Sequence, residues 1–192
     1  MMIFSFGAST AQGARDTEGG GFIGRLAKRL AERHRIRVEN CGVGGHTTEQ
    51  MLPRLADLPI ASQEDIAIVT LGINDVPRTP DPAPQKRVPL DRHKSNVQRL
   101  LADLAGRCRV LYLTQYPVDF TGRGLERQVV ESYVEAGRQA AGEAGVEILD
   151  INLEIDQEKY RVFIDDDGMH FNASGHAYIE GRIWQRLEPW LE

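Results

Sequence analysis

The sequence has little cysteine: Cys41 and Cys108 are its two copies in 192 residues, far apart and without the paired spacing of a zinc site. We therefore expect neither a disulfide framework nor a structural metal, and a reducing, cytoplasmic location. Long apolar runs are also missing, so no membrane span is predicted. An excess of positive charge is absent as well, since 23 basic residues face 28 acidic ones. That balance argues against nucleic acid or anionic lipid as a partner.

What is present describes an ordinary globular protein, with 41% hydrophobic and 27% charged residues. A chain of this length can bury a sizeable core without covalent or metal crosslinks. We expect a single domain over residues 1–192. The stretch 1–7 carries no basic leader and is predicted to form a buried first strand.

Short apolar runs rich in β-branched residues alternate with segments whose apolar residues recur every three or four positions, which predicts an α/β fold. Strands are expected at 2–6, 36–39, 65–71, 109–114 and 146–151. The clearest helices are expected at 22–33, 48–55, 93–105, 128–144 and 173–190. Because strands joined by helices run parallel, we predict a three-layer α/β/α sandwich around a five-stranded parallel sheet of flavodoxin-like layout.

Polar and glycine residues follow the predicted strands at four places. Ser9 comes after the first strand, the glycine-rich stretch 42–47 after the second and Asn74 after the third. A DxxH pair, Asp167 and His170, follows the fifth strand. Because open α/β sheets bind ligands at the carboxyl edge of their strands, these four blocks are expected to converge on one site.

These residue types are suited to ester cleavage by a serine nucleophile. A serine hydroxyl needs a base within about 3 Å, and imidazole can accept its proton and return it to the leaving group. His170 is the candidate base, and Asp167 can reach the imidazole Nδ1 proton across one turn. The backbone N–H groups of Ser9 and Gly45 and the side-chain amide of Asn74 would stabilise the developing oxyanion.

Serine, glycine, asparagine and histidine in this order and in these contexts resemble the SGNH hydrolase superfamily, also called the GDSL esterases and lipases. The resemblance covers nearly the whole chain. It implies that Ser9 is the nucleophile, that Gly45 and Asn74 belong to the oxyanion hole, and that Asp167 and His170 complete the catalytic triad.

The resemblance also implies an activity: hydrolysis of carboxylic esters, with short acyl or O-acetyl groups favoured, through an acyl-serine intermediate. No cofactor and no metal are expected, and the expected partner is a small-molecule ester. Val76, Tyr116 and Pro117 follow the third and fourth strands and are expected to line the substrate pocket. Arg78 and Arg87 fit either an anionic substrate group or a solvated rim.

Other functions stay open. Ala8 stands where the family has the aspartate of Gly-Asp-Ser, a departure that bears on how firmly the nucleophile loop is held and favours a non-catalytic module. Acyl transfer to an acceptor other than water shares the first half-reaction. The GxGxxG pattern at 19–24 with Glu39 imitates a dinucleotide fingerprint, although it does not follow the first strand directly. A metal-dependent hydrolase using Asp75 and the DxxH pair would leave serine and asparagine without roles.

Some residue assignments have alternatives too. Asp150, Asp165 or Asp166 could serve as the acid in place of Asp167. Thr47 could simply cap a helix, with Gln50 completing a capping box. The remaining histidines are expected to be surface residues: His34, His46, His93 and His176.

Overall fold

The computed structural model describes residues 1–33, 35–120, 122–156 and 160–191. Its strands are β1 (Met2–Gly7), β2 (Arg37–Gly42), β3 (Ile66–Thr70), β4 (Arg109–Leu113) and β5 (Glu147–Leu149). They form one sheet in the order β2-β1-β3-β4-β5, and every neighbouring pair is parallel. The predicted five-stranded, flavodoxin-like sheet is therefore confirmed.

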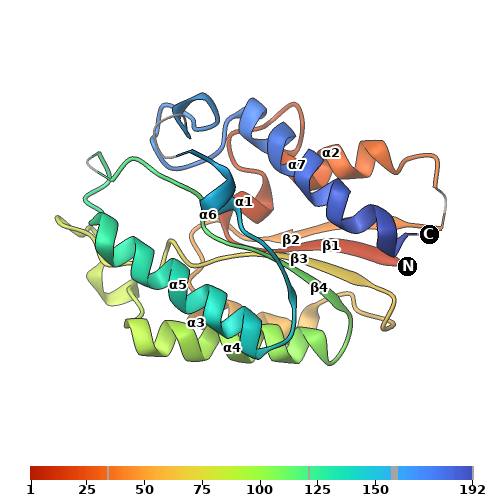
Figure 1. Ribbon diagram of the computed structural model, residues 1–192, viewed down its shortest axis with the longest axis horizontal. Coiled ribbons are helices and arrows are strands. Elements are labelled where there is room, and N and C mark those ends of the chain that lie inside the picture. The colour runs from red at the N-terminus through yellow and green to blue at the C-terminus, as the bar shows by residue number, and fades with distance from the viewer. Residues whose placement is uncertain (34, 121, 157–159, 192) are drawn as a thin grey trace.

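Helices cover both faces of the sheet (Figure 1). The long helices are α2 (Gly21–Arg29) and α7 (Ala173–Leu187) on one face, and α4 (Leu90–Ala105) and α5 (Arg127–Glu143) on the other. Three short helices follow strands closely: α1 (Ser9–Gln12), α3 (Thr48–Met51) and α6 (Ile151–Glu154). Among the described helices, none is both long enough and apolar enough to cross a membrane.

Four 3₁₀ turns are found in the described residues: η1 (Leu52–Asp57), η2 (Pro84–Lys86), η3 (Tyr160–Val162) and η4 (Glu188–Trp190). Two of them shorten predicted helices. The segment 48–55 is α3 followed by η1, and the segment 173–190 is α7 followed by η4. A proline stands at the start of each of these 3₁₀ turns, Pro53 and Pro189, where it cannot donate the next helical hydrogen bond.

The core lies on both sides of the sheet because the central strands are buried on both faces. All residues of β1 and β3 are buried. Side chains alternate along these strands. Ile3 and Ile68 pack in the cluster that contains α2 and α7, whereas Phe4 and Val69 pack in the cluster that contains α4. Burying each such side chain stabilises the fold by about 1.5–3 kcal/mol, which fixes the strands whose carboxyl ends carry the site.

Gly7 ends β1 and turns the chain toward Ser9. Its φ is +149°, a region that side chains rarely adopt, and a Cβ at this position would lie 1.9 Å from the carbonyl oxygen of Thr70. Only glycine therefore allows β1 and β3 to end this closely together, and the nucleophile candidate begins α1 directly beyond the sheet edge.

Candidate active site

Ser9, His170 and Asp167 lie in one hydrogen-bonded line, although Ser9 and His170 are 161 residues apart in sequence. His170 Nε2 is 2.9 Å from Ser9 Oγ. The other ring nitrogen, Nδ1, is 2.6 Å from Asp167 Oδ2. The side chains of His170 and Asp167 keep 22% and 12% of their surface exposed, so the line is open to solvent at the histidine. This arrangement can move a proton from the hydroxyl to the imidazole.

Asp167 is held in place by its own loop. Its Oδ1 accepts the backbone N–H groups of Met169 at 2.8 Å and His170 at 2.9 Å. Burial alone would raise its pKa, but the hydrogen bonds from the His170 backbone, the His170 ring and the Met169 backbone hold the pKa of Asp167 well below its usual range. Arg15 and Arg123 add ion pairs at 3.3 and 3.5 Å. The carboxylate therefore stays ionised and can fix the imidazole with its proton on Nδ1.

The other carboxylates considered for this role point elsewhere. Asp150 accepts from the Thr114 hydroxyl at 2.9 Å and from Arg138 at 2.6 Å. Asp165 accepts the backbone N–H of Asp167 at 3.4 Å. Asp167 is therefore the carboxylate that contacts His170 among the described residues.

The glycine-rich loop lies beside Ser9. The N–H of Gly44 donates to Gln12 Oε1 at 3.0 Å, and a Cβ added at Gly44 would be 3.9 Å from the Cβ of Ser9. Gly45 has a φ of +78° and open space where a side chain would begin. Within the described residues, no acceptor takes up the N–H of Gly45. The close approach of substrate that the sequence predicts at this glycine is therefore sterically possible.

The other two oxyanion candidates face the same region. Ser9 is the first residue of α1, where helix geometry leaves the N–H without an intrahelical acceptor. Asn74 follows β3, and its Nδ2 donates to the carbonyl of His46 at 3.0 Å, which joins the asparagine to the glycine-rich loop. An amide has a second N–H, which can serve an oxyanion. The action of these donors on a substrate stays a prediction.

The helix α1, which begins with the candidate nucleophile, is held in place although Ala8 stands where the family has an aspartate. Ala8 is buried, and its carbonyl accepts the N–H of Gln12 at 2.9 Å. Asn40 of β2 donates to the carbonyl of Gln12 at 2.9 Å. The hydroxyl of Thr10 bonds to the hydroxyl of Tyr116 at 2.9 Å. Contacts to two other segments, β2 and the stretch after β4, thus fix the short helix that begins with Ser9.

Val76, Tyr116 and Pro117, which we expect to line the substrate pocket, are all buried. The Tyr116 ring stacks on Phe171, the neighbour of His170, at a centroid distance of 3.7 Å. Tyr116 therefore supports the loop that carries His170. The contact of Val76, Tyr116 and Pro117 with substrate stays a prediction.

The prediction that His93 and His176 are surface residues is wrong, because both are buried. His93 Nδ1 lies 2.7 Å from Asp75 Oδ2, and that carboxylate also accepts the N–H of Thr48 at 2.9 Å and its hydroxyl at 2.5 Å. The sequence holds a signal for this position, since His93 shares the apolar face of α4 with Val97 and Leu100.

His176 binds two backbone groups. Its Nδ1 accepts the N–H of Phe22 at 3.2 Å, so its Nε2 carries the proton that is donated to the carbonyl of Ala14 at 3.1 Å. Burial lowers the pKa of His176 and keeps the ring neutral. His46 is partly buried, and His34 lies outside the described residues.

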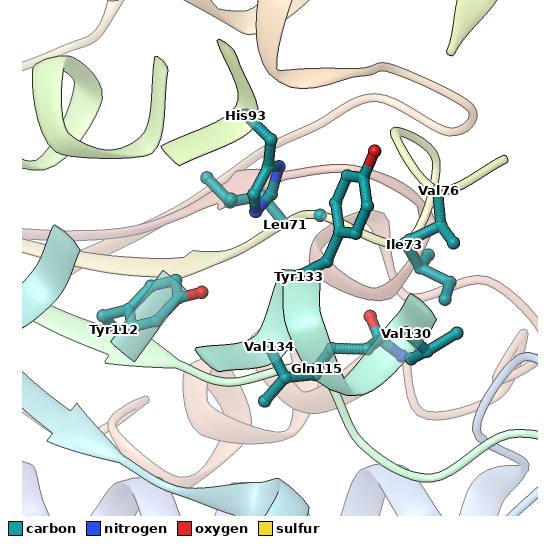
Figure 2. A pocket seen from close by; sticks show the side chains of 10 residues that line it. Leu71, Ile73, Val76, His93, Tyr112, Gln115, Val130, Tyr133 and Val134 are labelled. Atoms are coloured by element: carbon teal, nitrogen blue, oxygen red, sulfur yellow. The ribbon is translucent and has the colours of Figure 1, made fainter. Parts of the chain in front are cut away.

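A cavity of about 10 Å³ lies next to His93 (Figure 2). Tyr112, Gln115 and Tyr133 contribute polar atoms to its wall, and the ring of Tyr133 lies 4.9 Å from that of His93. This volume holds about one water molecule. Neither Ser9 nor His170 lines the cavity, so it is not the space in which an ester would bind.

Among the glycines at 19–24, three pack against other backbone and Gly19 lies against the side chains of Asp16 and Arg25, so no open nucleotide loop is formed. They lead into α2, and a Cβ at Gly21 would lie 2.3 Å from the Cα of Gly13. Thr47 and Gln50 form the capping box considered from the sequence. In the ranges that the structure describes, no group of three or more histidine, cysteine, aspartate or glutamate side chains could hold a metal ion.

The parallel sheet flanked by helices, with serine, histidine and aspartate aligned at its carboxyl edge, is the arrangement typical of serine hydrolases built on a flavodoxin-like α/β fold. The particular family follows from comparison with known sequences. Residues 5–178 match the GDSL-like lipase/acylhydrolase family, and the chain belongs to it. The resemblance to the SGNH esterases is thus confirmed, and the chain is a hydrolase that acts on ester bonds.

Individual relatives are distant. The chain is 27% identical over 194 residues to the human isoamyl acetate-hydrolyzing esterase 1 homolog, covering 88% of this chain and 75% of the relative. It is 24% identical over 150 residues to an acetylxylan esterase of Geobacillus stearothermophilus, covering 75% and 68%. The crystal structure of a lipase/acylhydrolase from Enterococcus faecalis matches 98% of this chain and 95% of its own with a TM-score of 0.78 at 18% identity, which supports the fold.

Proposed function

We propose that residues 1–192 act as one domain that hydrolyses carboxylic esters of short acyl groups, O-acetyl esters above all, through an acyl-Ser9 intermediate. The observation that carries this proposal is the line of short hydrogen bonds from Ser9 Oγ through His170 to Asp167. A serine hydroxyl within 2.9 Å of an imidazole that is itself oriented by a carboxylate has the geometry of an activated nucleophile.

In the proposed reaction, Ser9 Oγ attacks the ester carbonyl while its proton passes to His170 Nε2. The N–H groups of Ser9 and Gly45 and the amide of Asn74 would hold the oxyanion of the tetrahedral intermediate. The intermediate collapses when the imidazolium returns the proton to the alcohol oxygen and the C–O bond breaks. Water, deprotonated by His170, then attacks the acyl-enzyme and releases the acid.

The choice of a short acyl group rests on the relatives. The names of two of them refer to acetate esters, isoamyl acetate and acetylxylan. A cytoplasmic location is part of the proposal, supported by the two cysteines, both of which are free thiols.

The test is covalent labelling together with turnover. A fluorophosphonate probe should label the wild-type protein on Ser9, and p-nitrophenyl acetate should be hydrolysed. Ser9→Ala should abolish labelling and lower turnover by at least about 10³-fold, since the activated nucleophile is lost. The matched control is Ser132→Ala, which removes an exposed hydroxyl on α5 and should change neither signal.

The alternatives give different results. A wild-type protein that is folded but inert toward the probe and toward esters would contradict the proposal and favour a non-catalytic module. Labelling of Ser9 without release of acid, but with product formed when a second alcohol is added, would indicate acyl transfer instead of hydrolysis.

A further inference from the structure

Arginines gather around the candidate active site on three loops. Four of them, Arg15, Arg78, Arg87 and Arg123, lie close to two aspartates, Asp81 and Asp167. Three of the four have oxygen partners. Arg87 donates to both carboxylate oxygens of Asp81 at 2.8 and 3.0 Å, and to the carbonyl of Asn74 at 2.7 Å. Arg15 and Arg123 both contact Asp167.

Arg78 differs from the other three. Its guanidinium has one contact within the described residues, from Nη2 to the sulfur of Met169 at 3.7 Å, and sulfur is a weak acceptor. Its Nε is buried and has no partner in the described part of the chain. Leaving a buried donor without an acceptor is unfavourable, and more so for a charged group.

The charges around Arg78 do not balance it. Burial lowers its pKa first, and the like charges of Arg87 and Arg123 lower it further. Asp81 acts in the opposite direction, but both of its oxygens are already bound to Arg87. An added anion at Arg78 would therefore be favoured both by hydrogen bonding and by charge.

A hollow of about 300 Å³ opens beside this guanidinium. Among the described residues, its wall contains Arg78 and Arg123 but no acidic residue, and the remaining lining residues are Thr79, Pro80, Pro82, Gly122 and Gly124. The N–H of Thr79 donates to the carbonyl of Gly124 at 2.7 Å, which fastens the two loops that form the hollow. Two guanidinium groups without a carboxylate in the wall make a space suited to an anion.

The hollow adjoins the candidate triad. Arg123, in its wall, donates to the carbonyl oxygen of Asp167. Arg78 contacts Met169, which immediately precedes His170. An anionic group in the hollow and an ester bond at Ser9 can therefore belong to one molecule.

We propose that Arg78, together with Arg123, binds an anionic oxygen group of the substrate, a carboxylate above all, so that the protein prefers acyl esters of acidic compounds over those of neutral ones. This inference rests on the proposed function. A planar carboxylate can accept two parallel N–H bonds from one guanidinium, which is why we place it ahead of other anions.

The experiment compares matched substrates that differ in charge. We would measure kcat/KM for 3- and 4-acetoxybenzoate and for the corresponding neutral acetoxybenzamides, and include 4-acetoxyphenyl phosphate to separate carboxylate from phosphate. The wild-type protein should prefer at least one benzoate isomer over its amide by about tenfold or more, the size of a charged hydrogen bond. Arg78→Gln should reduce this ratio to near one. The control Arg99→Gln, an exposed arginine on α4, should leave the ratio as in the wild type.

A binding measurement separates this inference from the proposed function. The Ser9→Ala protein should bind the product 4-hydroxybenzoate at least about tenfold more tightly than 4-hydroxybenzamide, and the added Arg78→Gln change should remove the difference. If no ester is cleaved but this binding is seen, the anion site is supported and the hydrolase proposal fails. If esters are cleaved without any preference for charge, or with a preference that Arg78→Gln does not alter, the inference is overturned and the hydrolase proposal stands. A preference for the phosphate over both benzoates would overturn the choice of a carboxylate.

Discussion

The described part of the chain contains two aspartate–histidine pairs with nearly equal contact distances in very different surroundings. In the candidate active site, Asp167 Oδ2 and His170 Nδ1 are 2.6 Å apart. In the core, Asp75 Oδ2 and His93 Nδ1 are 2.7 Å apart. The first pair keeps 12% and 22% of its side-chain surface exposed, whereas the second keeps 0% and 1%. An aspartate–histidine contact alone therefore does not identify a catalytic site.

The position of the hydroxyl separates the two pairs. Ser9 Oγ lies at the far ring nitrogen of His170, where its proton can be taken up. Thr48 Oγ1 instead donates to the Asp75 carboxylate and accepts from Asn96 at 3.0 Å, so no imidazole stands at its oxygen. The buried pair joins α3, the turn after β3 and α4, and we interpret it as structural.

The largest expected effect is a difference in kcat between variants of the two histidines. His170→Gln should lower kcat for p-nitrophenyl acetate by at least about 10³-fold, since no base remains at Ser9. His93→Gln should lower kcat by no more than about tenfold, because the ring lies inside the core and does not contact Ser9. The rate of His93→Gln would be divided by the concentration of probe-reactive Ser9. The rate of His170→Gln would be divided by the concentration of folded protein. Equal losses in the two variants would break the comparison.

The sheet and the four polar blocks could be predicted from the sequence because each is a local signal. Buried strands such as β1 and β3 are short runs rich in apolar residues. Ser9, Asn74 and the DxxH pair come shortly after strands or in the last loop before α7. The rule that parallel strands share one edge was then enough to bring distant blocks together.

Other features depend on contacts that no local pattern contains. The helix α1 has four residues, too few to show a periodicity, and is held by Asn40 and Tyr116 from two separate segments. The burial of His93 beside Asp75 depends on how α4 docks on the sheet. The lack of an oxygen partner for Arg78 becomes visible only when its neighbours are placed in space.

The second expected effect is on the free energy of unfolding. Here the buried pair should contribute more than the pair in the candidate active site. Asp75→Asn should lower the free energy of unfolding by about 3 kcal/mol, because it disturbs a sealed network with Thr48 and His93. For a chain of this size that corresponds to a fall in Tm of about 6–12 °C. Asp167→Asn should cost only about 1 kcal/mol, since its carboxylate is partly solvated. Urea unfolding of both variants at pH 7 checks this, and a larger loss for Asp167→Asn would contradict our view of the buried pair as the structural one.

The smallest expected effect is on how the thermal stability of the protein depends on pH. The pKa of Asp167 is lowered in the folded protein relative to an unfolded value of about 3.9, so its contribution to stability is fully present above that pH and is lost as the pH falls toward the folded value. The wild-type protein should therefore lose more Tm between pH 6 and pH 3 than Asp167→Asn, which has no carboxylate to protonate there. Other aspartates also titrate in this range, but they are common to both proteins and cancel in the difference. Parallel Tm curves for the two proteins would mean that the hydrogen bonds from Met169 and His170 do not stabilise the ionised carboxylate, and the orientation of His170 by Asp167 would lose its electrostatic basis.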